Sequence, residues 1–185
     1  MPKTILRDAE TRMQKAVEAT ARDFAHVRTG RASASLLDNI LIDYYGTKSP
    51  INQVATITIP EPRLIVIQPW DKTVMKDVER AIAQSDLGLN PNNDGNVIRI
   101  QIPELTTERR QELTRYVAKL AEEGRVAIRN IRRDANDALQ KLEKSREISQ
   151  DERHTYAAEV QDCTDLYTDQ TNELLKSKEE ELLEL

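Results

Sequence analysis

Glycine and proline are confined to one part of this chain of 185 residues, and their distribution constrains the fold more than any other feature. All five glycines and all seven prolines lie at or before Gly124, and residues 30–103 contain four of the glycines and six of the prolines. Neither residue type occurs between Ile5 and Arg28, and from Thr106 onward Gly124 stands alone. Because both residue types interrupt helices, this distribution predicts two long helical regions that flank a module of different architecture.

Apolar periodicity predicts three amphipathic helices in the flanking regions. The apolar residues recur at helical intervals and so share one face of each helix. They are Leu6, Met13, Val17, Phe24 and Val27 in the first helix, Leu113, Val117, Leu120, Ile128, Ile131, Ala135, Leu139 and Leu142 in the second, and Tyr156, Val160, Tyr167, Leu174 and Leu182 in the third. Ser149 and Glu152 form a capping-box pattern before the third helix. A second helix near 40 residues would be roughly 60 Å long, so the helices are expected to pack as an elongated antiparallel bundle.

The middle of the chain predicts a β-β-β-α-β module. Short β-branched and aromatic runs bounded by glycine, proline or asparagine indicate strands, and these are expected at 39–46, 54–59, 63–68 and 96–102. Val74, Val78 and Ile82 are spaced four apart and predict one helix that covers a sheet face. The segment "GTKSP" (46–50) is predicted to be a turn, and "LGLNPNNDG" (87–95) a returning loop.

The predicted fold class is therefore α+β, with a discontinuous three-helix bundle (1–29 and 106–185) and a small inserted domain (31–103). The two crossings between them, at 29–35 and 102–106, are expected to form a hinge. Gly30 suits the end of a helix and Pro103 the end of a strand. The predicted hinge residues are Thr29, Gly30, Arg31, Ala32, Ser33, Ala34, Ser35, Pro103, Glu104 and Leu105.

Charge is distributed unevenly along the chain, whose net charge is −5. Residues 147–185 carry three basic and twelve acidic side chains, whereas residues 104–146 carry eleven basic and eight acidic ones. In the second helix, helical spacing places four arginines in a stripe that we expect to face solvent while the apolar residues face the bundle. These are Arg125, Arg129, Arg132 and Arg133. Guanidinium groups bind phosphates bidentately, and the stripe lacks aromatic residues for base stacking, so it predicts binding to folded RNA through shape and phosphate.

Two other interpretations remain open at this point. The arginine stripe is also explained as a solvated helix face paired with Glu122 or Asp137. The whole chain is also explained as a coiled-coil adaptor that recruits protein partners through its acidic third helix. Binding that weakens with salt in proportion to the phosphates neutralised would favour the RNA interpretation.

No catalytic or metal-binding arrangement is evident in the sequence. His26 and His154 have no ligand partners at metal spacing, and Cys163 lies beside acidic residues that would raise its pKa. We therefore predict a protein that is not an enzyme and has no metal or cofactor. The single cysteine suits a reducing compartment, and no run of roughly 20 apolar residues is present, so a cytoplasmic protein without a membrane span is expected.

Four motifs in order, covering essentially the whole chain, resemble the ribosome recycling factor family. They are "HVRTGRASASLLD", "DLGLNPN", "IRIQIPELTTERRQEL" and "VAIRNIRRDAND". The chain differs from the family at Ala34, where proline is frequent, and at Trp70, where phenylalanine is common.

The resemblance implies an L-shaped monomer with the outline of a transfer RNA. It also implies a function: with elongation factor G and GTP, the family splits the post-termination 70S ribosome into subunits. The bundle would contact large-subunit rRNA through Arg132, with Arg129 and Arg133 beside it, and Arg28 and Arg31 match a basic pair at the hinge.

Overall fold

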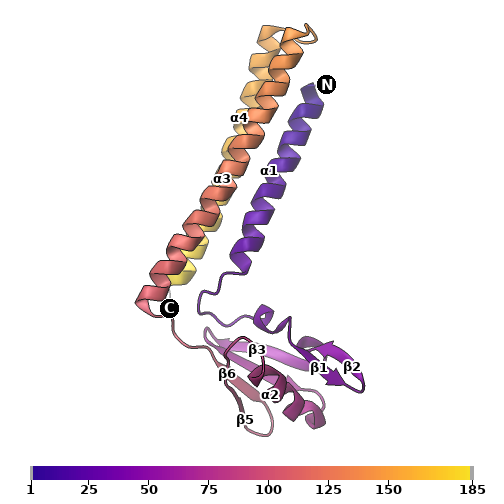
Figure 1. Cartoon of the computed structure of the whole chain (residues 1–185), viewed down its shortest axis with the longest axis vertical. Coiled ribbons are helices and arrows are strands. Elements are labelled where there is room, and N and C mark those ends of the chain that lie inside the picture. The colour runs from indigo at the N-terminus through magenta and orange to yellow at the C-terminus, as the bar shows by residue number, and fades with distance from the viewer. Residues whose placement is uncertain (1, 184–185) are drawn as a thin grey trace. The chain divides into compact units, whose positions relative to one another are not determined.

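The computed structural model describes residues 2–183, and the chain divides into two compact units (Figure 1). One unit contains the described residues up to Thr29 together with those from Thr107 onward, and the other is Gly30–Thr106. The first unit is therefore discontinuous in sequence, because the second is inserted into it.

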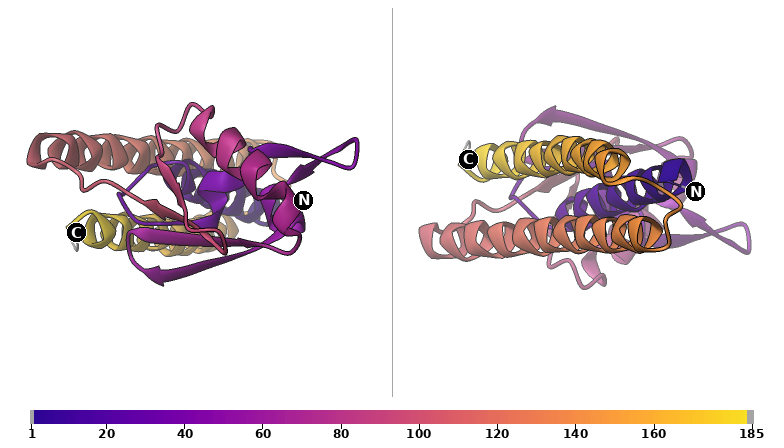
Figure 2. Two further views of the ribbon diagram at one scale, coloured as in Figure 1. Left: turned by 90° about the horizontal axis from the view of Figure 1, so that it is seen from below. Right: turned by 90° about the horizontal axis from the view of Figure 1, so that it is seen from above.

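Three long helices make up the first unit within residues 2–183: α1 (Pro2–Ala25), α3 (Thr107–Lys144) and α4 (Gln150–Leu183). Each packs against the other two, and α3 runs antiparallel to both of its neighbours (Figures 1 and 2). At 1.5 Å per residue, the 38 residues of α3 span roughly 57 Å. The main core cluster consists of Ala9, Met13, Ile128, Ile131, Ala135, Leu139, Ile148, Val160 and Tyr167. Among the helices that the structure describes, none is both long and apolar enough to cross a membrane.

Small and hydroxyl-bearing residues form a second part of the bundle interior. Thr20, Thr164 and Thr171 are buried, and each hydroxyl donates to the backbone carbonyl oxygen four residues earlier in its own helix. Gly124 of α3 faces Thr20 of α1 and Thr171 of α4. A Cβ atom at Gly124 would overlap Thr20 Oγ1 and would lie 3.7 Å from Thr171 Cγ2. The helices therefore approach closely where side chains are smallest.

The α3–α4 connection is held by a backbone cap at the end of α3 and a side-chain capping box at the start of α4. Arg146 adopts a left-handed conformation (φ 62°) just after α3, and the Glu147 amide donates to the carbonyl oxygen of Leu142. At the start of α4, the Glu152 amide donates to Ser149 Oγ at 3.1 Å and the Ser149 amide donates to Glu152 Oε2 at 2.9 Å. The predicted capping box is confirmed.

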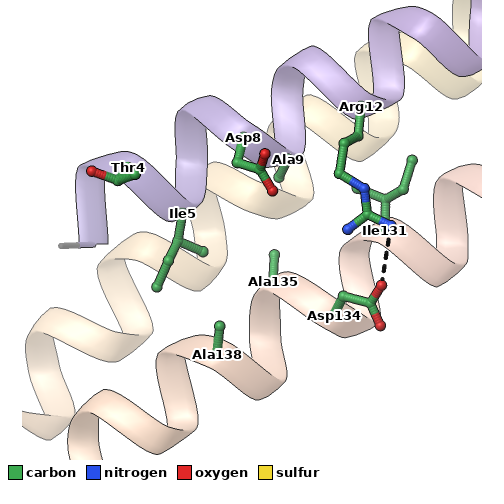
Figure 3. Close-up of a pocket in the computed structure, with 9 residues that line it drawn as sticks. All are labelled: Thr4, Ile5, Asp8, Ala9, Arg12, Ile131, Asp134, Ala135 and Ala138. Carbon is green, nitrogen blue, oxygen red and sulfur yellow. Dashed lines mark hydrogen bonds and ion pairs between the residues drawn. The ribbon is translucent and has the colours of Figure 1, made fainter.

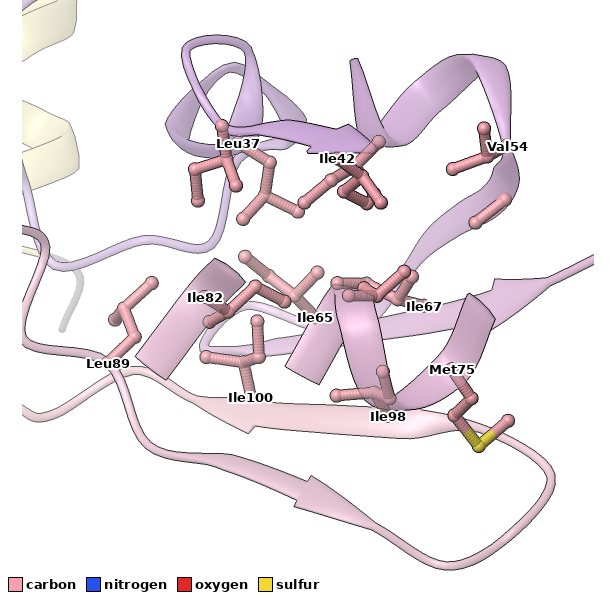
Figure 4. Close-up of a cluster of buried hydrophobic side chains, with 14 of the residues drawn as sticks. Leu37, Ile42, Val54, Ile65, Ile67, Met75, Ile82, Leu89, Ile98 and Ile100 are labelled. Atoms are coloured by element: carbon pink, nitrogen blue, oxygen red, sulfur yellow. The ribbon is translucent and has the colours of Figure 1, made fainter. Parts of the chain in front are cut away.

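The second unit contains two antiparallel sheets and one α-helix. Strands β1 (Leu41–Tyr44) and β2 (Thr47–Pro50) form a hairpin. Within the described chain, a sheet of order β3-β4-β6-β5 is formed by β3 (Ala55–Glu61), β4 (Leu64–Pro69), β5 (Pro91–Asn93) and β6 (Ile98–Gln101). Helix α2 (Met75–Ala83) buries Met75, Val78 and Ile82 against the sheet. Figure 4 shows the resulting isoleucine-rich core, which includes Ile65, Ile67, Ile98 and Ile100.

The prediction for the inserted module was wrong in two places. Residues 46–50 were predicted as a turn, but Tyr45 and Gly46 alone make the turn, both with positive φ, and the chain returns at once as β2. Residues 87–95 were predicted as a loop but include β5, whose Pro91 and Asn93 pair with Ile100 and Ile98 of β6. Pro-Asn-Asn has little β-propensity, and this edge strand is held by its pairing with β6. The element order is therefore β-β-β-β-α-β-β.

With these changes inside the module, the predicted fold class is confirmed: a mixed helix and sheet chain in which a small β-rich domain interrupts a bundle of long helices. The overall L shape stays a prediction.

Candidate nucleic-acid interface

Four arginines lie along about 12 Å of α3, from Arg125 to Arg133, at 1.5 Å per residue. Arg129 and Arg133 are exposed, whereas Arg125 and Arg132 are partly buried. The expectation that all four point straight into solvent was therefore wrong for two of them. Ile128, which is fully buried, lies three residues after Arg125 and four before Arg132. Residues at these spacings are neighbours on a helix surface, so both arginines border the core rather than oppose it.

Arg125 and Arg132 both reach across to α4. Arg125 Nη1 donates to Asn172 Oδ1 at 2.8 Å, and Arg132 Nη1 donates to Gln161 Oε1 at 3.2 Å. Gln161 Nε2 in turn donates to Asp165 Oδ1 at 2.8 Å. These neutral amides orient two guanidinium groups without cancelling their charge.

Glu122 joins the other end of the stripe. Its carboxylate accepts from Arg129 Nη2 at 2.8 Å and from Arg125 Nε at 3.0 Å. These hydrogen bonds, the one from Arg129 first, lower the pKa of Glu122 below its ordinary value. The pairing with Glu122 that the alternative interpretation expects is therefore present. Both Glu122 and Arg129 are about half exposed, and such ion pairs contribute only about 0–1 kcal/mol, so a phosphate can compete for Arg129.

At the other end of the stripe, Arg132 and Arg133 donate to neutral side-chain amides rather than to carboxylates. This end therefore stays comparatively basic. Arg133 Nη2 donates to the neutral Asn130 Oδ1 at 3.2 Å. Asp134, the adjacent acid, is paired with Arg12 of α1 at 3.3 Å (Figure 3). That ion pair borders a shallow groove between α1 and α3, which is lined by Ile5, Ala9, Ala135 and other residues.

The predicted hinge residues are held to different degrees. Gly30 has φ 80°, in the left-handed region that favours glycine, and Thr29 is buried. Further along, the Ala32 amide donates to the Pro62 carbonyl oxygen at 2.6 Å. Ala34 and Ser35 lie in a 3-10 turn (Ala34–Leu37) that Ser33 caps. Residues 32–35 are thus already fixed within the second unit.

The second crossing is held by Arg63, which follows Pro62 in the β3–β4 turn. The Ile102 amide donates to the Arg63 carbonyl oxygen at 2.8 Å. Beyond it, Glu104 pairs with the Arg63 side chain at 3.0 Å. Pro103 and Leu105 lie on either side of this ion pair. Arg28 and Arg31 are exposed on either side of the boundary between the two units.

The two histidines and the single cysteine are the remaining side chains that the sequence analysis considered. His26 and His154 are both exposed. The pKa of the Cys163 thiol is raised, first by burial and then by the charge of Glu10, with Asp162 and Glu159 adding to it. The direction agrees with the prediction, but the largest cause and the role of Glu10 were missed. Among residues 2–183, no three His, Cys, Asp or Glu side chains gather closely enough to hold a metal ion.

The fold and this surface define a class: two-domain factors in which a rod of long helices presents ordered arginines and a small β-rich domain is inserted. A sequence model of the family described as "Ribosome recycling factor" matches residues 20–183. The chain belongs to the ribosome recycling factor family.

Curated relatives and solved structures agree with this assignment. Ribosome-recycling factors of Carboxydothermus hydrogenoformans and Geobacillus thermodenitrificans are 54% and 53% identical to the chain over 185 residues, which is 100% of both chains in each case. A solution structure of a ribosome recycling factor matches with a TM-score of 0.77 and 43% identity, covering 100% of this chain and 98% of the other. A second structure, described as models for the T. thermophilus ribosome recycling factor and the E. coli elongation factor G bound to the E. coli post-termination complex, matches with a TM-score of 0.66 and 46% identity over 99% of both chains.

Proposed function

We propose that this protein binds the post-termination 70S ribosome in the cytoplasm and, with elongation factor G and GTP, promotes its separation into subunits. The full-length similarity to ribosome recycling factors carries this proposal. Support also comes from the structural neighbour, in which a recycling factor and elongation factor G are bound to a post-termination complex.

The α3 arginines are the proposed contact with large-subunit rRNA. Arg132 is the central residue, Arg133 and Arg129 lie outward of it, and Arg125 extends the surface toward Asn172. Arginine forms bidentate, charge-assisted hydrogen bonds with phosphate. The amides of α4 hold Arg125 and Arg132 in place before binding, so less side-chain entropy is lost when phosphate is bound. Arg28 and Arg31 are proposed as further rRNA contacts.

The joint between the two units is proposed to bend over short segments, Thr29–Arg31 and Pro103–Thr106. Hydrogen bonds to the carbonyl oxygens of Pro62 and Arg63 hold the chain beyond these segments. Elongation factor G, acting on the inserted domain, would then rotate it about this joint. The stiff helices would transmit the force to the rRNA contact.

The activity is tested by light scattering of post-termination ribosomes mixed with the protein, elongation factor G and GTP. The expected result is a fall in scattering as subunits separate, and none when GTP or elongation factor G is omitted. Ribosomes that stay intact with all three components present would contradict the proposed function.

The rRNA contact is tested with Arg132→Ala and with Lys141→Ala as the matched control. Lys141 is an exposed cation nine residues along the same helix, which places it on the opposite side of α3. Arg132→Ala is expected to weaken sedimentation with ribosomes and to reduce the dependence of log K on log salt by about one unit. Lys141→Ala should leave both nearly unchanged. If wild type and Arg132→Ala bound ribosomes equally well, and circular dichroism showed both proteins to be folded, the assignment of Arg132 as an rRNA contact would be refuted.

A further inference from the structure

The four-stranded sheet of the second unit has one covered face and one open face. Side chains alternate between the two faces along each strand. On the covered face, isoleucines of β4 and β6 pack into the core that α2 and the β1–β2 hairpin complete (Figure 4). On the opposite face, Thr56 pairs with Gln68 across β3 and β4, and Val66 pairs with Arg99 across β4 and β6. Val66 is partly buried and the other three are exposed, so this face is accessible to solvent.

Trp70 lies at one end of the open face, directly after β4. Alternation along the chain places its ring on the same side as Gln68. Its indole N–H donates to Thr56 Oγ1 at 2.8 Å, and its backbone amide donates to the Val54 carbonyl oxygen at 3.1 Å. Trp70 is nevertheless 66% exposed. The ring is therefore fixed through its polar atom, while much of its apolar surface faces solvent.

The neighbours of Trp70 on this face are polar. Thr56 and Gln68 offer a hydroxyl and an amide, whereas the apolar residues Leu64 and Val66 lie farther back along β4 and are partly buried. Protein interfaces usually bury an aromatic anchor in an apolar, desolvated centre. An unpaired nucleobase needs a different combination, namely a planar ring to stack on and hydrogen-bonding groups beside it. The surroundings of Trp70 therefore suit a nucleobase better than a protein side chain.

Arg99 provides a second planar group on the open face. Its register partner Val66 is four residues before Trp70, which corresponds to roughly 13 Å along β4. The Arg99 side chain is 49% exposed and forms an ion pair with Asp94, and guanidinium planes also stack on bases. Because Asp94 offsets this charge, and Glu61 lies at the far turn beside Leu64, the face is not strongly basic. A ligand would be held mainly through its bases rather than its phosphates.

We propose that the open face of the β3-β4-β6-β5 sheet binds an unpaired segment of ribosomal RNA, with one base stacked on Trp70 and a second base against Arg99. The proposal rests on the proposed function, which places the protein on the ribosome and has α3 contact the same RNA. Four-stranded sheets that carry aromatic rings on an open face bind unpaired bases in this way. Paired bases expose no ring face, so double-stranded RNA is excluded as the ligand.

The fluorescence of Trp70 tests this site directly, because Trp70 is the single tryptophan of the chain. With excitation at 295 nm, single-stranded oligoadenylate added to the full-length protein should quench this fluorescence, and an RNA duplex should not. Stacking without phosphate contacts predicts quenching that changes little as the salt concentration rises. Fluorescence that oligoadenylate leaves unchanged, equal quenching by duplex, or quenching that disappears at high salt would each overturn the proposal.

Variants separate stacking from a general loss of structure. Binding of fluorescently labelled oligoadenylate is followed by anisotropy at high salt, and circular dichroism confirms that each variant is folded. Trp70→Ala is expected to weaken binding about tenfold, whereas Trp70→Phe keeps a ring and should retain most of the affinity. Lys76→Ala is the matched control, since Lys76 is an exposed cation of α2, on the covered side of the sheet. Equal affinity of Trp70→Ala and wild type would refute the stacking role.

The source of the RNA is tested on the ribosome itself. Full-length protein carrying Trp70→p-benzoylphenylalanine is bound to post-termination ribosomes and irradiated. A cross-link to rRNA supports the proposal. A cross-link to messenger RNA or to a protein, or none at all from protein that sediments with ribosomes, overturns it. Wild-type protein that does not sediment with ribosomes would instead contradict the proposed function, and the fluorescence titration, which needs no ribosome, distinguishes the two failures.

Discussion

Gly124→Ala tests whether the close approach of the three long helices depends on the absence of a side chain at Gly124. In an isolated helix, this change would stabilise by about 1 kcal/mol through propensity. Here the added Cβ overlaps Thr20 Oγ1, and Thr20 is 4% exposed. The Thr20 hydroxyl also donates to the Ala16 carbonyl oxygen at 3.1 Å, and a β-branched side chain has few alternative rotamers in a helix. The hydroxyl therefore has nowhere to move without a loss.

The magnitude follows from these opposing terms. Overpacking of a core costs about 1–3 kcal/mol, and breaking the Thr20 hydrogen bond adds about 1 kcal/mol. After the propensity gain is subtracted, Gly124→Ala should destabilise the bundle by about 1–3 kcal/mol. For a unit of this size the corresponding fall in Tm is a few degrees per kcal/mol. Thermal unfolding followed by circular dichroism at 222 nm measures it.

A double-mutant cycle with Thr20→Ala identifies the clash. Once Thr20→Ala removes the hydroxyl, the Cβ added at position 124 has room, and only the gain in helix propensity remains. Gly124→Ala should therefore stabilise the Thr20→Ala background by about 1 kcal/mol. The expected coupling energy is therefore about 3 kcal/mol. If Gly124→Ala raised the Tm of the wild type, or lowered the Tm of both backgrounds equally, the steric argument would be refuted.

Two further predictions concern the exposed residues Arg146 and Asp94. Arg146→Gly should stabilise the bundle by about 1 kcal/mol, measured by urea unfolding, because Arg146 has φ 62° where glycine is unstrained; an unchanged midpoint would contradict this. Asp94 accepts from the Asn96 and Val97 amides and from Arg99, and these bonds, the one from Val97 first, lower its pKa to about 2. Because the folded pKa lies below the unfolded one, the stabilisation is present above the ordinary Asp range and is lost as pH falls toward 2. Asp94→Asn should therefore reduce the pH dependence of the unfolding midpoint between pH 4 and pH 2, and an identical dependence would refute the role of Asp94.

Apolar periodicity predicted the helices because most of the buried positions follow it. Met13, Ile128 and Leu139 are fully buried, as their spacing indicates. The same pattern missed Thr20 and Thr171, since neither is apolar. Their burial depends on which residues of three separate helices meet at one level, and that register is absent from the spacing within any single helix.

The two missed strands have local explanations. Tyr45-Gly46 forms the turn that Asn-Gly usually forms, so the sequence carried only half of the signal for a two-residue hairpin. Pro91–Asn93 lacks β-branched residues and is a strand only because β6 lies beside it. In both cases tertiary pairing outweighed local propensity.

The candidate site was predictable to a similar extent. Helical spacing brought Arg125, Arg129 and Arg132 to one side of α3, but it gave no sign of Gln161 and Asn172. Those two amides lie on α4, and only the α3–α4 register brings them to the arginines. The rRNA-binding role of the arginines stays a proposal, as does the hinge.

The hydrogen-bond partners of the arginine stripe bear on how α3 would bind an anion. Four guanidinium groups left free on an exposed helix would each lose substantial rotamer entropy on binding. Asn172 and Gln161 remove part of that cost for Arg125 and Arg132, and as neutral groups they leave the positive charge in place. Glu122 acts differently, because its charge offsets that of Arg129 and Arg125 until a phosphate displaces it. The availability of the guanidinium groups therefore differs along the stripe. Those near Glu122 are held in exchangeable ion pairs, whereas Arg132 and Arg133 are bonded only to neutral amides in the contacts described above. We therefore expect the loss of Arg132 to weaken ribosome binding most.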